Sequence, residues 1–198
     1  KMGVPVFPVQ ADLISDAGCQ KLFEFIDHLR VVEEKKVGEL AVLVNSSSVM
    51  PRGDAKTLSL AEFDAAIALN LRAPFVCSQQ AYKRMEQGGV IINISDVASQ
   101  KAWVGYPAYT ISKAGMDSMT RVLARSFAPN VRVNAIAPGL VLKSDSHTTE
   151  DWERLVAQAI ICVADREDDI KPQTGLDAAN ATQLHLKHLP PQRWRQVS

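Results

Sequence analysis

Continuous apolar runs alternate along the chain with segments whose apolar residues recur at helical spacing. Short apolar runs over residues 40–44, 90–94 and 131–136 are typical of strands buried on both faces of a parallel sheet. The longer segments between them predict helices over 60–85 and 107–127. A capping box begins the first of these helices and a proline begins the second, as expected for helix starts.

The N-terminal part predicts one further strand and one further helix. Residues 4–11 form an extended run with two prolines, and residues 15–29 carry leucine, phenylalanine and isoleucine at helical spacing. Buried strands separated by long helices give a doubly wound parallel sheet with helices on both faces. The expected fold class is therefore α/β and Rossmann-like.

Polar loops follow three of the predicted strands. Residues 45–48 follow the first buried run, Ser95 and Asp96 follow the second, and Pro138 and Gly139 follow the third. In doubly wound sheets, ligands bind at the carboxyl ends of the strands. We therefore expect these loops to converge on one binding site.

Composition narrows the function classes. The 198 residues carry 22 Lys and Arg against 22 Asp and Glu, and this balance argues against a nucleic-acid partner. No apolar run approaches the roughly 20 residues that span a bilayer. The three cysteines lie far apart and lack the Cys-x-x-Cys spacing of a zinc site, so neither a metal site nor a disulfide framework is expected. We expect a cytoplasmic protein without a membrane partner.

Tyr109 and Lys113 are the first candidate catalytic pair. They stand four residues apart on a predicted helix, so their side chains share one face. A lysine ammonium beside a phenol favours the phenolate and lowers the phenol pKa from about 10 towards neutrality. Taken alone, the spacing also fits an ordinary surface pair. Asp96, thirteen positions before Tyr109, and Asn70 on the preceding helix add two further candidate groups.

Five segments, in order, resemble motifs of the short-chain dehydrogenase/reductase family. They read VLVNSSS from position 42, NLRAPF from 70, IINISD from 91, YTISKAG from 109 and VRVNAIAPG from 131. The resemblance covers roughly residues 4–157. It implies an NAD(P)-dependent oxidoreductase on a Rossmann-like fold.

The resemblance implies a role for each catalytic candidate. Tyr109 matches the proton donor of the family. Lys113 matches the residue that lowers the pKa of that tyrosine and holds the nicotinamide ribose. Asn70 matches the residue that positions a water in a proton relay behind the lysine.

The resemblance also implies residues that contact the cofactor. Asp12 looks like the acidic residue that contacts the adenine, and Asn45 and Ser47 lie where the loop passes the adenosine ribose. Pro138 and Gly139 resemble the loop that seats the nicotinamide. Two of these assignments have a plainer alternative, because Asp12 also fits a helix-capping residue and Pro138-Gly139 also fits a simple turn.

Asp96 departs from most of the family, which places serine there. A carboxylate at this position resembles the pteridine reductase and dihydromonapterin reductase branch, whose catalytic set is Asp, Tyr and Lys. A carboxylate beside a tyrosine passes a proton through water to a ring nitrogen, which suits reduction of a C=N bond. The resemblance therefore implies NADPH as cofactor, with NADH not excluded, a pterin or folate as the small-molecule substrate, and a homo-oligomer, commonly a tetramer.

The ten glycines include no Gly-x-Gly, so the printed sequence contains no glycine-rich pyrophosphate loop. In the family that loop belongs to the first βαβ unit, and this chain resembles the family from its third strand onward. We expect a Rossmann-like domain over residues 1–160 that lacks the first βαβ unit, and a divergent C-terminal tail over 161–198. Without the two earlier strands, edges of central strands would be left unpaired.

Three hypotheses for the function remain. The leading one is an NADPH-dependent reductase that transfers hydride to a dihydropteridine-type C=N bond. The first alternative is a 3-oxoacyl reductase or another short-chain carbonyl reductase. The second is an inactive fragment that serves only as an interaction scaffold. Asp96, Tyr109 and Lys113 favour an enzyme, whereas the absent glycine loop favours the scaffold.

Overall fold

The computed structural model describes residues 5–32, 38–139 and 148–154. The chain divides into two compact units, Lys1–Ala137 and Pro138–Ser198. The first unit contains every strand of the described sheet. The domain boundary predicted at residue 160, and the tail predicted beyond it, lie outside the described residues.

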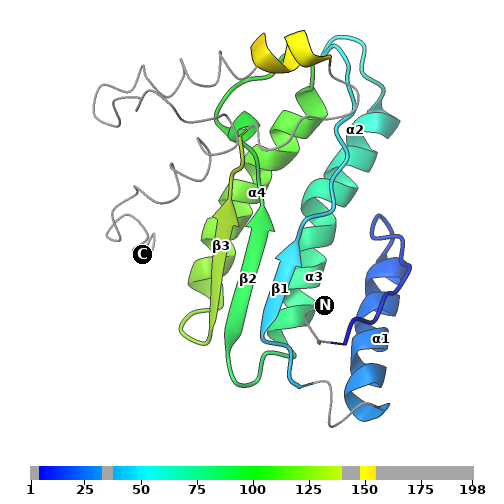
Figure 1. The fold of residues 1–198 in the computed structure, drawn as a ribbon, viewed down its shortest axis with the longest axis vertical. Helices are drawn as coiled ribbons and strands as arrows, with labels where there is room; N and C mark the ends of the chain where they lie inside the picture. Colours follow the sequence, from blue (N-terminus) through cyan, green and yellow to red (C-terminus); the bar gives the residue numbers. More distant parts are fainter. Residues whose placement is uncertain (1–4, 33–37, 140–147, 155–198) are drawn as a thin grey trace. The chain divides into compact units, whose positions relative to one another are not determined.

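The first unit is built on a parallel sheet of three strands (Figure 1). The strands are β1 Val42–Asn45, β2 Gly89–Ile94 and β3 Val131–Ile136, and they lie in the order β1-β2-β3. Both pairings are parallel, as sequential strands joined by long helices require. The predicted Rossmann-like α/β fold is thereby confirmed, with strand boundaries within two residues of those expected.

The helices lie where the apolar spacing placed them. They are α1 Asp16–Val32, α2 Leu60–Ile67, the π-helical segment η1 Ala68–Arg72, α3 Ala73–Tyr82, the 3-10 turn η2 Val97–Ser99 and α4 Pro107–Ser126. Ser59 and Glu62 form the predicted capping box at the start of α2. Within the described ranges, no helix combines the length and the apolar character that a membrane span needs.

A proline interrupts the helix predicted over 60–85. Pro74 has no N–H and therefore cannot complete an α-helical hydrogen bond to the carbonyl of Asn70. The chain widens into η1 at this place, where the N–H of Ala73 bonds the carbonyl of Ala68. Asn70 consequently lies in a π-helical segment, a distortion often found at functional sites.

The strand predicted over residues 4–11 is wrong for the described positions 5–11, which form no strand. Pro5 and Pro8 cannot donate to a ladder, and no described strand pairs with this segment. The helix predicted over 15–29 is confirmed as α1. Ser15 caps it, because its hydroxyl accepts a hydrogen bond from the N–H of Gly18 at 3.0 Å.

One face of the sheet carries the core. Asn45 contacts α3 through Ser78 and its register partner Asn93 contacts α4 through Thr120, so both helices cover the same face. The core consists of apolar residues from this face and from α1, α3 and α4: Cys19, Phe23, Ala73, Cys77, Ala81, Met85, Ile91, Met116, Met119, Leu123, Phe127, Val131 and Val133.

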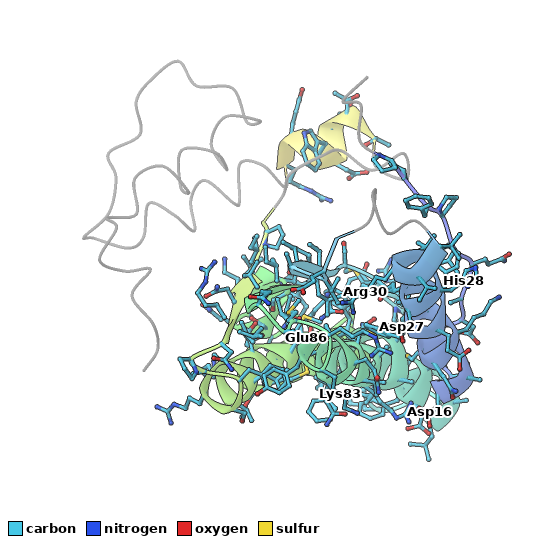
Figure 2. All side chains as sticks on the ribbon, turned by 90° about the horizontal axis from the view of Figure 1, so that it is seen from below. Asp16, Asp27, His28, Arg30, Lys83 and Glu86 are labelled. Atoms are coloured by element: carbon cyan, nitrogen blue, oxygen red, sulfur yellow. The ribbon has the colours of Figure 1, made fainter. Side chains whose placement is uncertain are left out.

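The opposite face of the sheet is partly exposed, so the expectation that the strands are buried on both faces is wrong. Val42 and Val44 of β1 are 52% and 53% exposed, and β3 alternates buried and exposed residues. Among the described helices, α3 and α4 both lie on the core face, and α1 packs on α3. Arg84 donates two hydrogen bonds to Asp27 of α1, at 2.7 and 2.6 Å, and lies over the ring of Phe23. Figure 2 labels Asp27 on α1, where that helix adjoins α3.

A buried amide network joins the two strands that lead to the candidate site. The Asn45 side-chain nitrogen donates to the Asn93 oxygen at 2.8 Å, and the Asn93 nitrogen donates to the Thr120 hydroxyl at 2.9 Å. Asn93 is 0% exposed. The network therefore fixes the spacing of β1, β2 and α4 by polar contacts that have no access to water.

We predict that Asn93→Ala lowers the free energy of unfolding by about 2–3 kcal/mol, because it leaves buried donors and acceptors unpaired. Equilibrium unfolding in urea measures this loss. Asn134→Ala, at an exposed position of β3, serves as the matched control and should change stability by less than about 0.5 kcal/mol. Equal losses in the two variants would contradict the structural role of the network.

Candidate active site

Asp96, Tyr109 and Lys113 come together at the carboxyl end of β2. The Tyr109 hydroxyl donates a hydrogen bond to Asp96 Oδ2 at 2.8 Å. The Lys113 Nζ donates to the carbonyl oxygen of Ile94, also at 2.8 Å, and lies 5.5 Å from the centre of the Tyr109 ring. The structure thus brings the three predicted catalytic groups into one cluster, at the sheet edge where the sequence placed them.

Both helix residues of the cluster are buried. Tyr109 is 7% exposed and Lys113 is 3% exposed, although both stand on a helix with many solvent-facing positions. Their spacing of four residues directs them to the same face, and that face contacts Ile94 at the end of β2 and Asp96 just after it. The ordinary surface pair considered from the sequence is therefore wrong.

The pKa of Tyr109 moves opposite to the expected direction. Burial raises the pKa of the phenol, and the hydrogen bond and negative charge of Asp96 raise it further. Lys113 was expected to lower this pKa, yet its ammonium points to the Ile94 carbonyl rather than to the phenol oxygen. Burial and Asp96 therefore favour the protonated phenol, which is the form that carries a proton to donate.

The lysine is subject to opposing influences. Burial lowers the pKa of Lys113, because removing an ammonium from water is costly, while the carboxylates of Asp96 and Asp117 raise it. Asp96 is fixed at its second oxygen as well, since Oδ1 accepts from the N–H of Ala98 at 2.8 Å. The cluster thus pairs a buried cation with a carboxylate whose orientation is set by the backbone.

Asn70 connects the site to the loop after β1. Its side-chain oxygen accepts from the N–H of Val49 and its nitrogen donates to the carbonyl of Val49, both at 2.8 Å. The nitrogen also donates to the hydroxyl of Ser112, next to Lys113, at 3.0 Å. Asn70 is completely buried. Its predicted role in a water relay stays a prediction.

Two residues predicted to contact the cofactor have bonds within the fold. Asn45 is 7% exposed, and its amide nitrogen is occupied by Asn93 and Ser78. Asp12 is exposed, and its carboxylate accepts from the N–H of Ile14 at 3.1 Å, in the turn before α1. That geometry supports the alternative of a turn-forming residue for Asp12 and leaves its contact with adenine a prediction.

The cofactor contacts predicted for Ser47, Pro138 and Gly139 stay predictions. Ser47 is half-buried in the loop after β1. Pro138 and Gly139 belong to the second unit. Lys113, by contrast, has an ammonium with three N–H donors, of which one hydrogen bond goes to the Ile94 carbonyl. Together with the oxygen of the Tyr109 hydroxyl, which can accept a hydrogen bond, these donors fit the hydroxyl groups of a ribose.

Sequence reasoning missed two side chains beside the cluster. The ring of Trp103 lies 6.5 Å from that of Tyr109, centre to centre, with 22° between the planes. Asp117 accepts a short hydrogen bond from the Ser95 hydroxyl. An isolated tryptophan between Asp96 and Tyr109, and a carboxylate four residues after Lys113, were the available signals.

Removing the carboxylate next to Tyr109 should lower the pKa of its phenol. In Asp96→Asn we expect the alkaline titration of Tyr109 to move to lower pH, because the accepting charge is lost while burial remains. Ultraviolet absorbance of tyrosinate measures it, with Tyr109→Phe subtracted to isolate the one residue. Asp64→Asn, an exposed carboxylate on α2, is the control. An unchanged titration in Asp96→Asn would show that Asp96 does not raise the pKa of the Tyr109 phenol.

Comparison with known proteins shows which family the chain resembles. A family model described as enoyl-(acyl carrier protein) reductase matches residues 1–164. An uncharacterized oxidoreductase of Thermotoga maritima is 35% identical over 140 residues, which are 65% of this chain and 55% of that protein. The 3-oxoacyl-(acyl-carrier-protein) reductase FabG of Aquifex aeolicus is 33% identical over 144 residues, 71% of this chain and 55% of its own length.

A solved structure is also similar to this chain. FolM alternative dihydrofolate reductase 1 from Brucella canis, complexed with NADP, matches with a TM-score of 0.65 and 32% identity, over 76% of this chain and 57% of that one. The chain spans about half the length of the curated relatives it matches. Because the family model matches most of its residues, the chain belongs to the short-chain dehydrogenase/reductase family of NAD(P)-dependent oxidoreductases.

Proposed function

We propose that the protein is an NADPH-dependent reductase that transfers hydride to the C=N bond of a dihydropteridine. The observation that carries the proposal is the 2.8 Å hydrogen bond from the Tyr109 hydroxyl to Asp96 Oδ2. A tyrosine alone would serve any short-chain reductase. The carboxylate at position 96 is what favours a substrate whose reduced atom is a ring nitrogen.

The proton for the ring nitrogen comes from the Asp96–Tyr109 pair. Hydride adds to the carbon of the C=N bond, and the nitrogen must gain one proton in the same turnover. Burial and the Asp96 carboxylate raise the pKa of Tyr109, which favours the phenol form that carries this proton. Asp96 accepts the phenol hydrogen bond and shuttles a proton through water towards the nitrogen. A serine at this position would instead steady a carbonyl oxygen.

Lys113 places a positive charge beside this pair. Its Nζ is fixed by the Ile94 carbonyl at 2.8 Å and lies 5.5 Å from the centre of the Tyr109 ring. When the phenol gives up its proton, the developing negative charge is stabilised by the ammonium. The same group has donors left for the ribose of the cofactor. Lys113 therefore orients the cofactor and supports the proton transfer.

NADPH, when bound, supplies the hydride. The Lys113 donors and the Tyr109 hydroxyl oxygen fit its nicotinamide ribose, whereas no Gly-x-Gly in the printed sequence fits its pyrophosphate. The NADP bound by the Brucella canis relative supports the choice of cofactor, and NADH stays open. Asp12, Asn45, Ser47, Pro138 and Gly139 are proposed as the further cofactor contacts.

A carbonyl reductase is the second candidate function. It is supported by the 33% identity to the 3-oxoacyl-(acyl-carrier-protein) reductase of Aquifex aeolicus. The Tyr109 and Lys113 arrangement serves a carbonyl as well as an imine, because both reductions need a proton donor next to the hydride acceptor. The two candidates differ in what Asp96 contributes.

The partners proposed are a small-molecule substrate, a pterin or folate, and further copies of the same chain. Exposed apolar side chains along α3 and α4, at Phe75, Ile111 and Val122, support a homo-oligomer formed through these helices, and a tetramer is proposed from the family. A cytoplasmic location is proposed from the balanced charge and from the free thiols Cys19 and Cys77.

Tyr109→Phe should reduce the rate of dihydropteridine reduction at least about a hundredfold, because it removes the proton donor and leaves the ring. NADPH oxidation with dihydrobiopterin measures the rate, and acetoacetyl thioester is compared as a carbonyl substrate. Tyr82→Phe is the matched control, since Tyr82 stacks on Phe127 away from the cluster. An unaffected rate in Tyr109→Phe contradicts the catalytic assignment, and exclusive use of the thioester would favour the 3-oxoacyl reductase.

A further inference from the structure

Helix α4 bonds three consecutive residues at the end of β2. Lys113 Nζ donates to the carbonyl of Ile94, and the next residue, Ser95, donates from its hydroxyl to Asp117 Oδ1. The residue after that, Asp96, accepts from the hydroxyl of Tyr109. The three helix residues stand four apart, so one face of α4 makes all three contacts (Figure 1 shows α4 behind β2 and β3). Two of the contacts belong to the catalytic pair and its lysine, and the third is unassigned.

Asp117 is the unassigned residue. It is half-buried one helical turn beyond Lys113, and its partner Ser95 is 2% exposed. Ser95 lies between the residue that accepts from Lys113 and the residue that accepts from Tyr109, so its hydrogen bond to Asp117 fixes both neighbours. Asp117 also contributes a negative charge near the buried ammonium.

We propose that Asp117 is a positioning residue of the active site, which holds the end of β2 in register with α4 through Ser95. The proposal rests on the proposed function, because it assigns Lys113 and Asp96 their catalytic roles. It goes beyond that function by naming a group that acts through other residues and touches neither substrate nor cofactor.

Two carboxylates contribute negative charge near Lys113, and they differ in their hydrogen-bond partners. Asp96 accepts the Tyr109 hydroxyl and is assigned to proton transfer by the proposed function. Asp117 accepts the Ser95 hydroxyl instead. The neutral phenol of Tyr109 also lies beside Lys113, with its ring centre 5.5 Å from Nζ.

The first experiment measures the protonation of Lys113 directly. The protein is labelled with carbon-13 at the lysine ε-carbon, and the Lys113 resonance is assigned by its loss in Lys113→Arg. In Asp117→Asn we expect the Lys113 titration to move to lower pH, because a charge that opposes burial is removed while the side-chain volume stays. Asp64→Asn, on the exposed side of α2, should leave the titration in place. An unmoved titration in Asp117→Asn contradicts the proposed position of the Asp117 carboxylate beside Lys113.

The second experiment tests whether the Ser95–Asp117 contact, which holds the end of β2 against α4, affects the rate. In the dihydropteridine assay, Ser95→Ala should lower kcat about tenfold with little change in the substrate KM, because the catalytic groups are displaced rather than removed. Ser95→Thr, which keeps the hydroxyl, should restore most of the rate. If Asp117→Asn fails to fold, the Ser95 pair still decides the proposal. Equal rates for Ser95→Ala and the parent overturn the positioning role.

The two proposals fail in different ways. If the parent protein reduces no pteridine and no carbonyl, the proposed function is wrong, while the Lys113 titration still tests Asp117. If the parent is active and its pH profile does not change in Asp117→Asn, the reductase stands and Asp117 is only a structural residue of α4.

Discussion

The register between the end of β2 and helix α4 is the constraint on which the candidate site depends. Residues 94–96 are bonded one by one to Lys113, Asp117 and Tyr109. A strand advances about 3.3 Å per residue and a helix about 5.4 Å per turn, so three consecutive contacts between them need a fixed crossing of the two elements. The hydrogen bond from Asn93 of β2 to Thr120 of α4, next in sequence to Ile94, helps to fix this crossing. Catalytic geometry and core packing therefore depend on the same contact between strand and helix.

Local sequence patterns predicted most of the fold because each pattern had one physical explanation. Continuous apolar runs marked β1, β2 and β3, a capping box marked the start of α2, and a proline marked the start of α4. The extended run over 5–11 failed since a strand also needs a neighbour, and that information is not local. The exposed valines of β1 were missed for the same reason, because apolar sequence does not say which helices cover a face.

The sequence predicted which residues form the candidate site, but it did not predict how their surroundings change the Tyr109 pKa. Spacing placed Tyr109 and Lys113 on one face, and position placed Asp96 opposite them. The spacing of residues in the sequence does not show how deeply their side chains are buried. Burial and Asp96 raise the pKa of Tyr109, whereas the sequence predicted that it would be lowered. Asp117 continued the four-residue spacing and could have been included. Asn45 was read as a cofactor residue, while the strand register occupies its amide nitrogen with Asn93.

The central claim is that Asp96 directs this site towards a ring nitrogen. The most direct measurement is the ratio of kcat/KM for dihydrobiopterin to that for acetoacetyl thioester, determined for the parent protein and for Asp96→Ser. The proposed chemistry predicts that the ratio falls by about a hundredfold in the variant, because the serine retains a hydroxyl for carbonyl substrates and loses the proton relay. A ratio that stays the same in Asp96→Ser would contradict it.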